Sequence, residues 1–219
     1  PGSYSCKTKV EDPKIMAAQA IDLAQIREKG KLSVVTDFNS INYFIYRGQP
    51  MGFQYEMLHE LAEYLNIELE LKANNDVIAN FESLINGEFD IIASNLTITN
   101  ARRELVDFTV PHSQTSQVLV QRNETGTETQ NREFIRNPIE LAGKTIYVRQ
   151  NSSYSARLRN LQEEIGEEIN IVEVPIETEQ LIKMVANGEI EFTVSDQNMA
   201  RVNKTYYPGI DIETAISFS

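Results

Sequence analysis

The sequence has few of the residues that build disulfides and metal sites. Its 219 residues include one cysteine, Cys6, and two histidines, His59 and His112, which lie far apart in the chain. A single cysteine excludes an internal disulfide, and without a cluster of cysteine and histidine a zinc site is not expected. We therefore predict neither a metal nor a cofactor.

Positive charge and long apolar runs are also scarce. Lys and Arg total 20 against 32 Asp and Glu, which gives a formal net charge of −12. Because no basic stripe is present to meet phosphates, a nucleic-acid partner is not expected. No apolar run approaches the roughly 20 residues that span a bilayer. The length suits one large or two small domains.

What the sequence does contain is an alternation of strand and helix patterns in both halves. The expected strands are residues 31–36, 67–71, 89–93, 116–121, 144–149, 169–174 and 190–194. The expected helices are residues 13–29, 54–65, 76–87, 152–165 and 177–186, with apolar positions at helical spacing. This alternation predicts an α/β fold in which mostly parallel sheets are covered by helices.

A short internal repeat suggests that the two halves are similar. Asn86–Ile91 (NGEFDI) is echoed 101 residues later by Asn187–Phe192 (NGEIEF). In each half a helix, this turn and an apolar strand are followed by a polar residue. Ligands of open α/β sheets bind outside the carboxyl ends of the strands, so two such halves would face each other across a cleft. A motif this short also arises by coincidence.

The stretch of residues 89–111 carries the main candidate site. It runs from an apolar strand through hydroxyl and amide side chains into a short helix with Arg102 and Arg103. Unpaired N–H groups at a helix start and an arginine fork together suit a carboxylate. The alternative is a surface turn with solvated arginines.

The order of motifs resembles the bacterial extracellular solute-binding proteins, family 3, which have the type II periplasmic binding fold. The motifs that carry the resemblance are Gly30–Val34, Gly52–Glu56, Asn86–Asp90, Thr97–Arg102, Val106–Pro111, Leu141–Lys144 and Ser195–Asp196. The resemblance implies two lobes, each a mostly parallel sheet flanked by helices, joined by a two-strand hinge. We expect a tether and helix start in residues 1–24, a first lobe in 25–115 plus 208–219, a second lobe in 116–207, and hinge strands near 113–117 and 204–210.

Two features carry a narrower resemblance: Tyr55-Glu56, where the binding proteins of transporters usually show Phe-Asp, and the tail from Val185 to Ser219. In these the chain resembles the non-catalytic N-terminal domains of membrane-bound lytic murein transglycosylases of type F. That likeness implies a sensor that binds an amino acid or small peptide derived from peptidoglycan and regulates an attached transglycosylase domain C-terminal to Ser219. It also favours Cys6 as a lipidation site and places the protein in the periplasm or cell envelope. We expect a monomer with no catalysis of its own.

The resemblance also implies a role for each candidate ligand-binding residue. Arg102 and Thr97 would hold the ligand α-carboxylate, and Ser152 would complete that shell from the second lobe. Asp196 would pair with the α-ammonium group, and Asp37 and Tyr43 would face the ligand side chain. Asn95 stands where the family usually has a smaller residue, and it would reshape the amine site.

Three alternatives stay open at this point. An amino-acid-binding protein that delivers its ligand to the permease of an ABC transporter would have nearly the same sequence features. An enzyme is disfavoured, because no nucleophile elbow, phosphate loop or metal-ligand spacing is present. A receptor-channel ligand core is disfavoured because no membrane segment interrupts the two halves.

Overall fold

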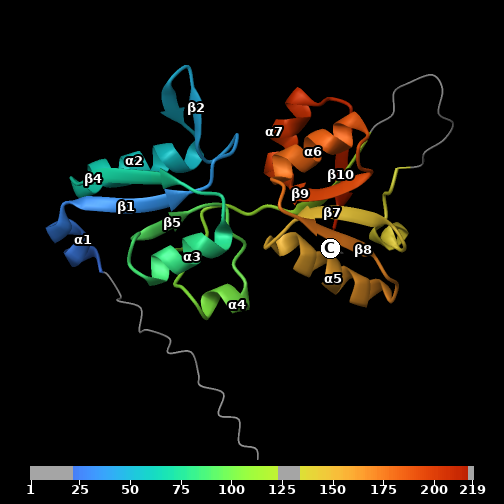
Figure 1. Cartoon of the computed structure of the whole chain (residues 1–219), viewed down its shortest axis with the longest axis horizontal. Coiled ribbons are helices and arrows are strands. Elements are labelled where there is room, and N and C mark those ends of the chain that lie inside the picture. The colour runs from blue at the N-terminus through green and yellow to red at the C-terminus, as the bar shows by residue number, and fades with distance from the viewer. Residues whose placement is uncertain (1–21, 123–133, 217–219) are drawn as a thin grey trace, which may run out of the picture.

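The computed structural model describes residues 22–122 and 134–216, so Cys6 and most of the expected tether lie outside the described residues. The chain forms two lobes side by side, and residues 104–116 carry it from one to the other across the middle of the molecule (Figure 1). Each lobe has its own sheet, and helices lie against both sheets.

The first lobe holds a three-stranded parallel sheet in the order β4-β1-β5. Its elements are α1 (Leu23–Lys29), β1 (Lys31–Thr36), β2 (Phe44–Tyr46), β3 (Gln49–Met51), α2 (Phe53–Leu65), β4 (Glu68–Ala73), α3 (Val77–Ile85), β5 (Ile91–Ala93) and α4 (Asn100–Arg103). Its core gathers residues of α1, α2, β1 and β5.

Local sequence signals account for the helix boundaries of this lobe. The Asp22 carboxylate accepts from the backbone N–H of Gln25 and the Gln25 side chain accepts in return, which is a capping box at the start of α1. Asp76 caps α3 by accepting from the backbone N–H groups of its first turn. Gly30 ends α1 in the left-handed conformation.

The second lobe holds a five-stranded mixed sheet in the order β10-β6-β9-β7-β8. Its elements are β6 (Gln117–Arg122), η1 (Pro138–Leu141), β7 (Thr145–Arg149), α5 (Ser153–Ile165), β8 (Asn170–Val174), α6 (Thr178–Asn187), β9 (Phe192–Asp196), α7 (Gln197–Tyr206) and β10 (Ile210–Ala215). Helix α5 contributes to one apolar cluster and α6 to another, and in Figure 1 they lie on opposite faces of the sheet.

The α/β two-lobed fold expected from the sequence is confirmed, with one correction to the lobe boundaries. Residues 208–219 were assigned to the first lobe, but β10 pairs with β6 in the second sheet. Residues 204–210, expected as a hinge strand, form the end of α7 and the turn into β10. The sheet of the second lobe is also less parallel than expected, because β6 runs antiparallel to both of its neighbours.

Candidate functional site

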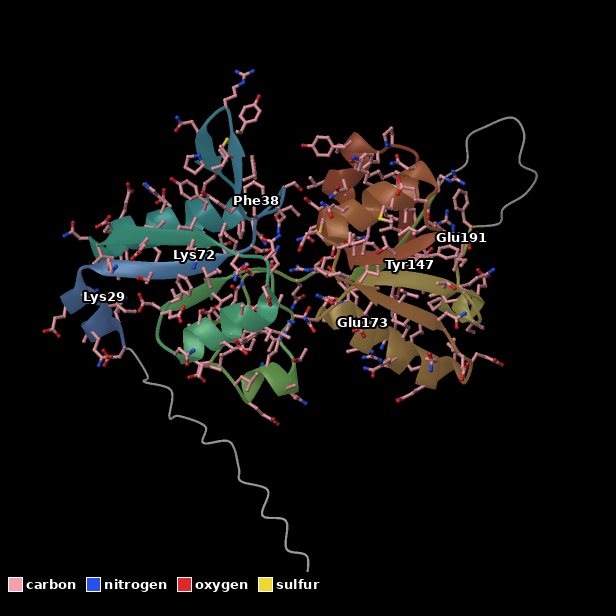
Figure 2. The ribbon with its side chains drawn as sticks, viewed as in Figure 1. Lys29, Phe38, Lys72, Tyr147, Glu173 and Glu191 are labelled. Carbon is pink, nitrogen blue, oxygen red and sulfur yellow. The ribbon has the colours of Figure 1, made fainter. Side chains whose placement is uncertain are left out.

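The carboxyl ends of β1, β5, β7 and β9 point toward the space between the two lobes. A groove of about 1530 Å³ runs through this space and along the first lobe. Of the residues expected at the site, Asn95, Thr97 and Asp196 line it. Figure 2 shows side chains of both lobes converging there, with Phe38 on the side of the first lobe that faces the second.

Asp196 is the most perturbed charge in the groove. It ends β9 and caps α7, and its backbone N–H donates to the Tyr154 hydroxyl at 3.3 Å. Burial raises the pKa of Asp196 from 3.8 to about 6, although a hydrogen bond with Tyr154 opposes the rise. No lysine or arginine of the described ranges forms an ion pair with it. A desolvated carboxylate without a cationic partner favours binding of a cation.

Hydroxyl groups from both lobes also meet in the groove. The Thr97 and Ser153 hydroxyl oxygens lie 3.0 Å apart, and the Gln117 side-chain amide donates to the Ser153 hydroxyl at 3.1 Å. Ser152, the serine that was expected at the site, stands at the N-cap position of α5 without a side-chain cap bond, and its hydroxyl donates to the Arg149 carbonyl at 2.6 Å. Ser153, which was not among the expected site residues, lines the groove, and Ser152 does not.

Arg102 lies beside the groove and is not one of its lining residues. Its Nη1 donates to the Thr97 carbonyl at 2.9 Å, and its guanidinium carbon lies 5.9 Å from the centre of the Phe81 ring. Burial lowers the pKa of Arg102. No carboxylate pairs with it in the described part of the chain. The guanidinium thus lies behind Thr97 and Phe81, and these two residues line the groove.

A smaller cavity of about 70 Å³ adjoins the groove in the first lobe. Asp37 and Asn95 line it, and Ser94 and Asn95 are common to the cavity and the groove. Tyr43, expected beside the ligand side chain, lines neither. Its ring lies 6.0 Å from those of Phe38 and Tyr55 and packs between them.

Direct contacts hold the two lobes together in addition to the Thr97 and Ser153 pair. Glu179 of α6 accepts from the backbone N–H of Ser40 at 3.2 Å and from the Ser40 hydroxyl. Arg149, at the end of β7, donates to the Asn75 carbonyl of the first lobe. Arg149 and Glu179 were not among the residues expected at the site. Each lies near the end of a second-lobe element, β7 or α6, that faces the first lobe.

Within the described ranges, no group of three or more His, Cys, Asp or Glu residues is arranged to hold a metal ion. Over the same ranges, no helix has both the length and the apolar character required to cross a bilayer.

Comparisons with known proteins agree with this geometry. The model of the bacterial extracellular solute-binding proteins, family 3, matches residues 30–156. A membrane-bound lytic murein transglycosylase F of Desulfosudis oleivorans is 36% identical over 194 residues, which are 87% of this chain and 40% of that protein. The one from Saccharophagus degradans is 30% identical over 196 residues, 89% of this chain and 38% of that protein. The chain thus spans about two fifths of these relatives.

Among solved structures, the arginine-bound form of a truncated ArgBP from T. maritima is similar, with a TM-score of 0.73 and 22% identity. The match covers 90% of this chain and 87% of that chain. At this identity the likeness shows the fold alone.

Proposed function

This chain belongs to the bacterial extracellular solute-binding proteins, family 3, and on that premise we propose that its groove binds an amino acid or the zwitterionic end of a small peptide. The observation that carries the proposal is Asp196, a desolvated carboxylate in an interlobe groove with no cationic partner among the described residues. A ligand ammonium group supplies the missing charge. Charge-assisted hydrogen bonds of this kind contribute about 1.5–3 kcal/mol each.

The ligand carboxylate belongs beside the hydroxyl pair of Thr97 and Ser153. Thr97 and Ser153 offer hydroxyl donors there, and the N-terminus of α5 has no side-chain cap to satisfy its N–H groups. Arg102 adds a positive charge behind Thr97 and moves onto the carboxylate by leaving the Thr97 carbonyl. The ammonium group is thereby held by Asp196, and the carboxylate by Thr97, Ser153 and the N-terminus of α5.

Isothermal titration calorimetry with a panel of amino acids and peptidoglycan stem peptides tests this assignment. We expect Arg102→Ala to weaken binding by about tenfold or more, which is the loss of one charge-assisted bond. Arg103→Ala is the matched control, because Arg103 is the exposed neighbour on α4 and should leave affinity unchanged. Equal affinity of the wild type and Arg102→Ala would refute the carboxylate role of Arg102.

We further propose that the chain is the non-catalytic sensor domain of a lytic murein transglycosylase at the cell envelope, anchored through a lipid at Cys6. The 36% identity to a relative of that name supports this role. The ligand is then peptidoglycan-derived, and the catalytic domain follows Ser219 in the whole protein. Purified residues 1–219 should not release muropeptides from peptidoglycan, and turnover would contradict the assignment.

Delivery of an amino acid to the permease of an ABC transporter is the second candidate, because the matching family is named for solute binding. The reading frame beyond Ser219 discriminates between the two roles. A lysozyme-like domain there favours the sensor, and a stop codon soon after one further segment favours transport. We propose a monomer in either case, which size-exclusion chromatography with light scattering tests.

A further inference from the structure

A buried tyrosine lies behind the charged end of the groove. Tyr154 is the second residue of α5, it is 7% exposed, and it belongs to the same apolar cluster as Val194 of β9. It does not line the groove, whereas its neighbour Ser153 does. The Tyr154 hydroxyl accepts from the backbone N–H of Asp196 at 3.3 Å. One side chain thus joins the start of α5, beside the hydroxyl pair, to the end of β9.

The Tyr154 hydroxyl also acts on the carboxyl group of Asp196. A hydrogen bond with Tyr154 lowers the pKa of Asp196, against the larger effect of burial. An ionised carboxylate only accepts hydrogen bonds, so Tyr154 donates its hydroxyl proton to it. The hydroxyl therefore accepts from the main chain of Asp196 and donates to the side chain of the same residue. A carboxylate held at both points keeps its direction.

A second buried hydroxyl holds that of Tyr154 in place. Thr178, the first residue of α6, forms a side-chain hydrogen bond with Tyr154. Because Tyr154 gives its single hydroxyl proton to Asp196, Thr178 is the donor in this bond. Burial raises the pKa of Tyr154, so its hydroxyl stays protonated while Asp196 titrates. The ends of α5, α6 and β9 meet at this hydroxyl.

The charged groups around Asp196 do not take over the role of Tyr154. The other charged residues that line the groove are Asp90, Asp107, Arg157 and Arg201. Arg157 of α5 is held by both carboxylate oxygens of Glu164, and on α6 the two neighbours of Thr178 are Glu177 and Glu179. The pKa of Asp196 responds to burial and to Tyr154, and none of these charges contributes to it.

We propose that Tyr154 is the positioning residue of the ligand site, whose hydroxyl holds the Asp196 carboxylate in the direction in which it meets the ligand ammonium group. The inference rests on the proposed function, in which Asp196 takes the ammonium group and Ser153 the carboxylate. Tyr154 does not touch the ligand. It keeps the two ends of the site in register through its ring, and its hydrogen bond favours the ionised form of a carboxylate that has no cationic partner in the described ranges.

Tyr154→Phe tests the inference, because it removes the hydroxyl and keeps the ring in the apolar cluster. In the ligand-free variant we expect the pKa of Asp196 to lie about one pH unit above its wild-type value. Carbon-13 NMR of the side-chain carboxyl groups over a pH titration measures this pKa, and the Asp196 signal is the one that Asp196→Asn removes. Thr178→Val should raise the same pKa by a smaller amount, because it frees the Tyr154 hydroxyl, and it keeps the inference testable if Tyr154→Phe does not fold.

Calorimetry with the common L-amino acids connects the hydroxyl to binding, and the amino acid that binds the wild type most tightly is the probe for the variants. At pH 8, where Asp196 is ionised in both proteins, we expect Tyr154→Phe to bind the probe about tenfold more weakly, because the carboxylate is no longer held. At pH 6.5 the loss should be larger, because less of the variant is ionised at Asp196. Tyr147→Phe is the matched control at a half-buried tyrosine of β7 that lines neither the groove nor the small cavity, and it should behave as the wild type (Figure 2).

The outcomes separate the inference from the proposed function. If Tyr154→Phe leaves either the pKa of Asp196 or the affinity at its wild-type value, the positioning role is refuted while amino-acid binding stands. A loss of affinity by the same factor at both pH values would also refute it, because a merely structural change has no dependence on the ionisation of Asp196. If no amino acid or stem peptide binds the wild type, the proposed function is refuted and the inference with it.

Discussion

Replacing Asp196 with asparagine should stabilise the free protein and abolish its ligand binding at the same time. The pKa of this carboxyl is raised from 3.8 to about 6 by burial. A carboxyl with a raised pKa in the folded state makes folding less favourable once it is ionised. The penalty is absent below pH 3.8, where both states are protonated, grows between pH 3.8 and 6, and is complete above pH 6.

The size of the effect follows from the pKa difference. One pKa unit corresponds to about 1.36 kcal/mol, so the full penalty approaches about 3 kcal/mol at neutral pH. Because Asp196 keeps partial contact with solvent, we expect roughly 1–3 kcal/mol. A chain of this length shifts its melting temperature by about 2–4 °C per kcal/mol. Asp196→Asn should therefore melt roughly 2–12 °C higher than the wild type at pH 7.5 and at nearly the same temperature at pH 4.

The assay is thermal unfolding of ligand-free protein by circular dichroism at the two pH values, with binding measured in parallel. Glu60→Gln makes the same change of charge at an exposed residue of α2 that lines neither the groove nor the small cavity, and it serves as the control. If Asp196→Asn lowers the melting temperature equally at pH 4 and pH 7.5, the carboxylate is a structural acceptor and the reasoning from unpaired charge is wrong. If the variant binds amino acids as the wild type does, Asp196 is not the ammonium site.

Three other predictions follow from the same geometry. Affinity for an amino acid should fall by up to about tenfold per pH unit as the pH drops below 6, because Asp196 must be ionised to pair with the ammonium group. Binding titrations from pH 4.5 to 7.5 test this, and an affinity that does not change with pH would contradict the role of Asp196. Gly52→Ala should lower the free energy of unfolding by about 2 kcal/mol or more, because Gly52 has a φ of 128° and a Cβ there would lie 2.4 Å from the Asn42 carbonyl oxygen. Urea unfolding measures this effect, and an unchanged urea midpoint would contradict it. Glu179→Ala should increase the radius of gyration of the ligand-free protein, since it removes both hydrogen bonds between Glu179 and Ser40. Small-angle X-ray scattering measures the radius, and an unchanged value would show that other contacts keep the lobes together.

Apolar periodicity and capping residues were sufficient to predict most of the regular structure. Helix α3 starts where Asp76 predicted it, because the carboxylate accepts from the N–H groups of Ile78 and Ala79. The strands of the β2–β3 hairpin were not among those expected from the sequence. Its turn has positive φ at Arg47 and Gly48, as a two-residue hairpin turn requires, but arginine lacks the preference for that conformation that makes Asn-Gly recognisable. The residues of β10 were assigned to the first lobe. Their pairing with β6 joins segments about 90 residues apart, and the local sequence does not specify such a pairing.

Three of the expected site residues, Asn95, Thr97 and Asp196, line the groove, and local packing accounts for the placement of the others. Ser152 and Ser153 are chemically alike, but the cap position turns the first toward the Arg149 carbonyl and leaves the second to face Thr97. Tyr43 was expected beside the ligand as an aromatic near Asp37, yet stacking with Phe38 and Tyr55 holds it away. Side-chain direction at a strand end depends on such packing, which a single sequence does not specify.

The contacts between the lobes explain why Arg149 and Glu179, which belong to no recognisable sequence motif, lie beside the groove. Arg149 and Glu179 reach the first lobe only because β7 and α6 present their ends to the groove, and each meets a group that the first lobe would otherwise expose to solvent. Asp196, on the neighbouring β9, meets none. The second lobe therefore meets the first lobe through Arg149 and Glu179, and within the described ranges it leaves Asp196 without an ion pair. Binding free energy for a small cation comes from that remaining charge, because its desolvation has already been incurred in folding.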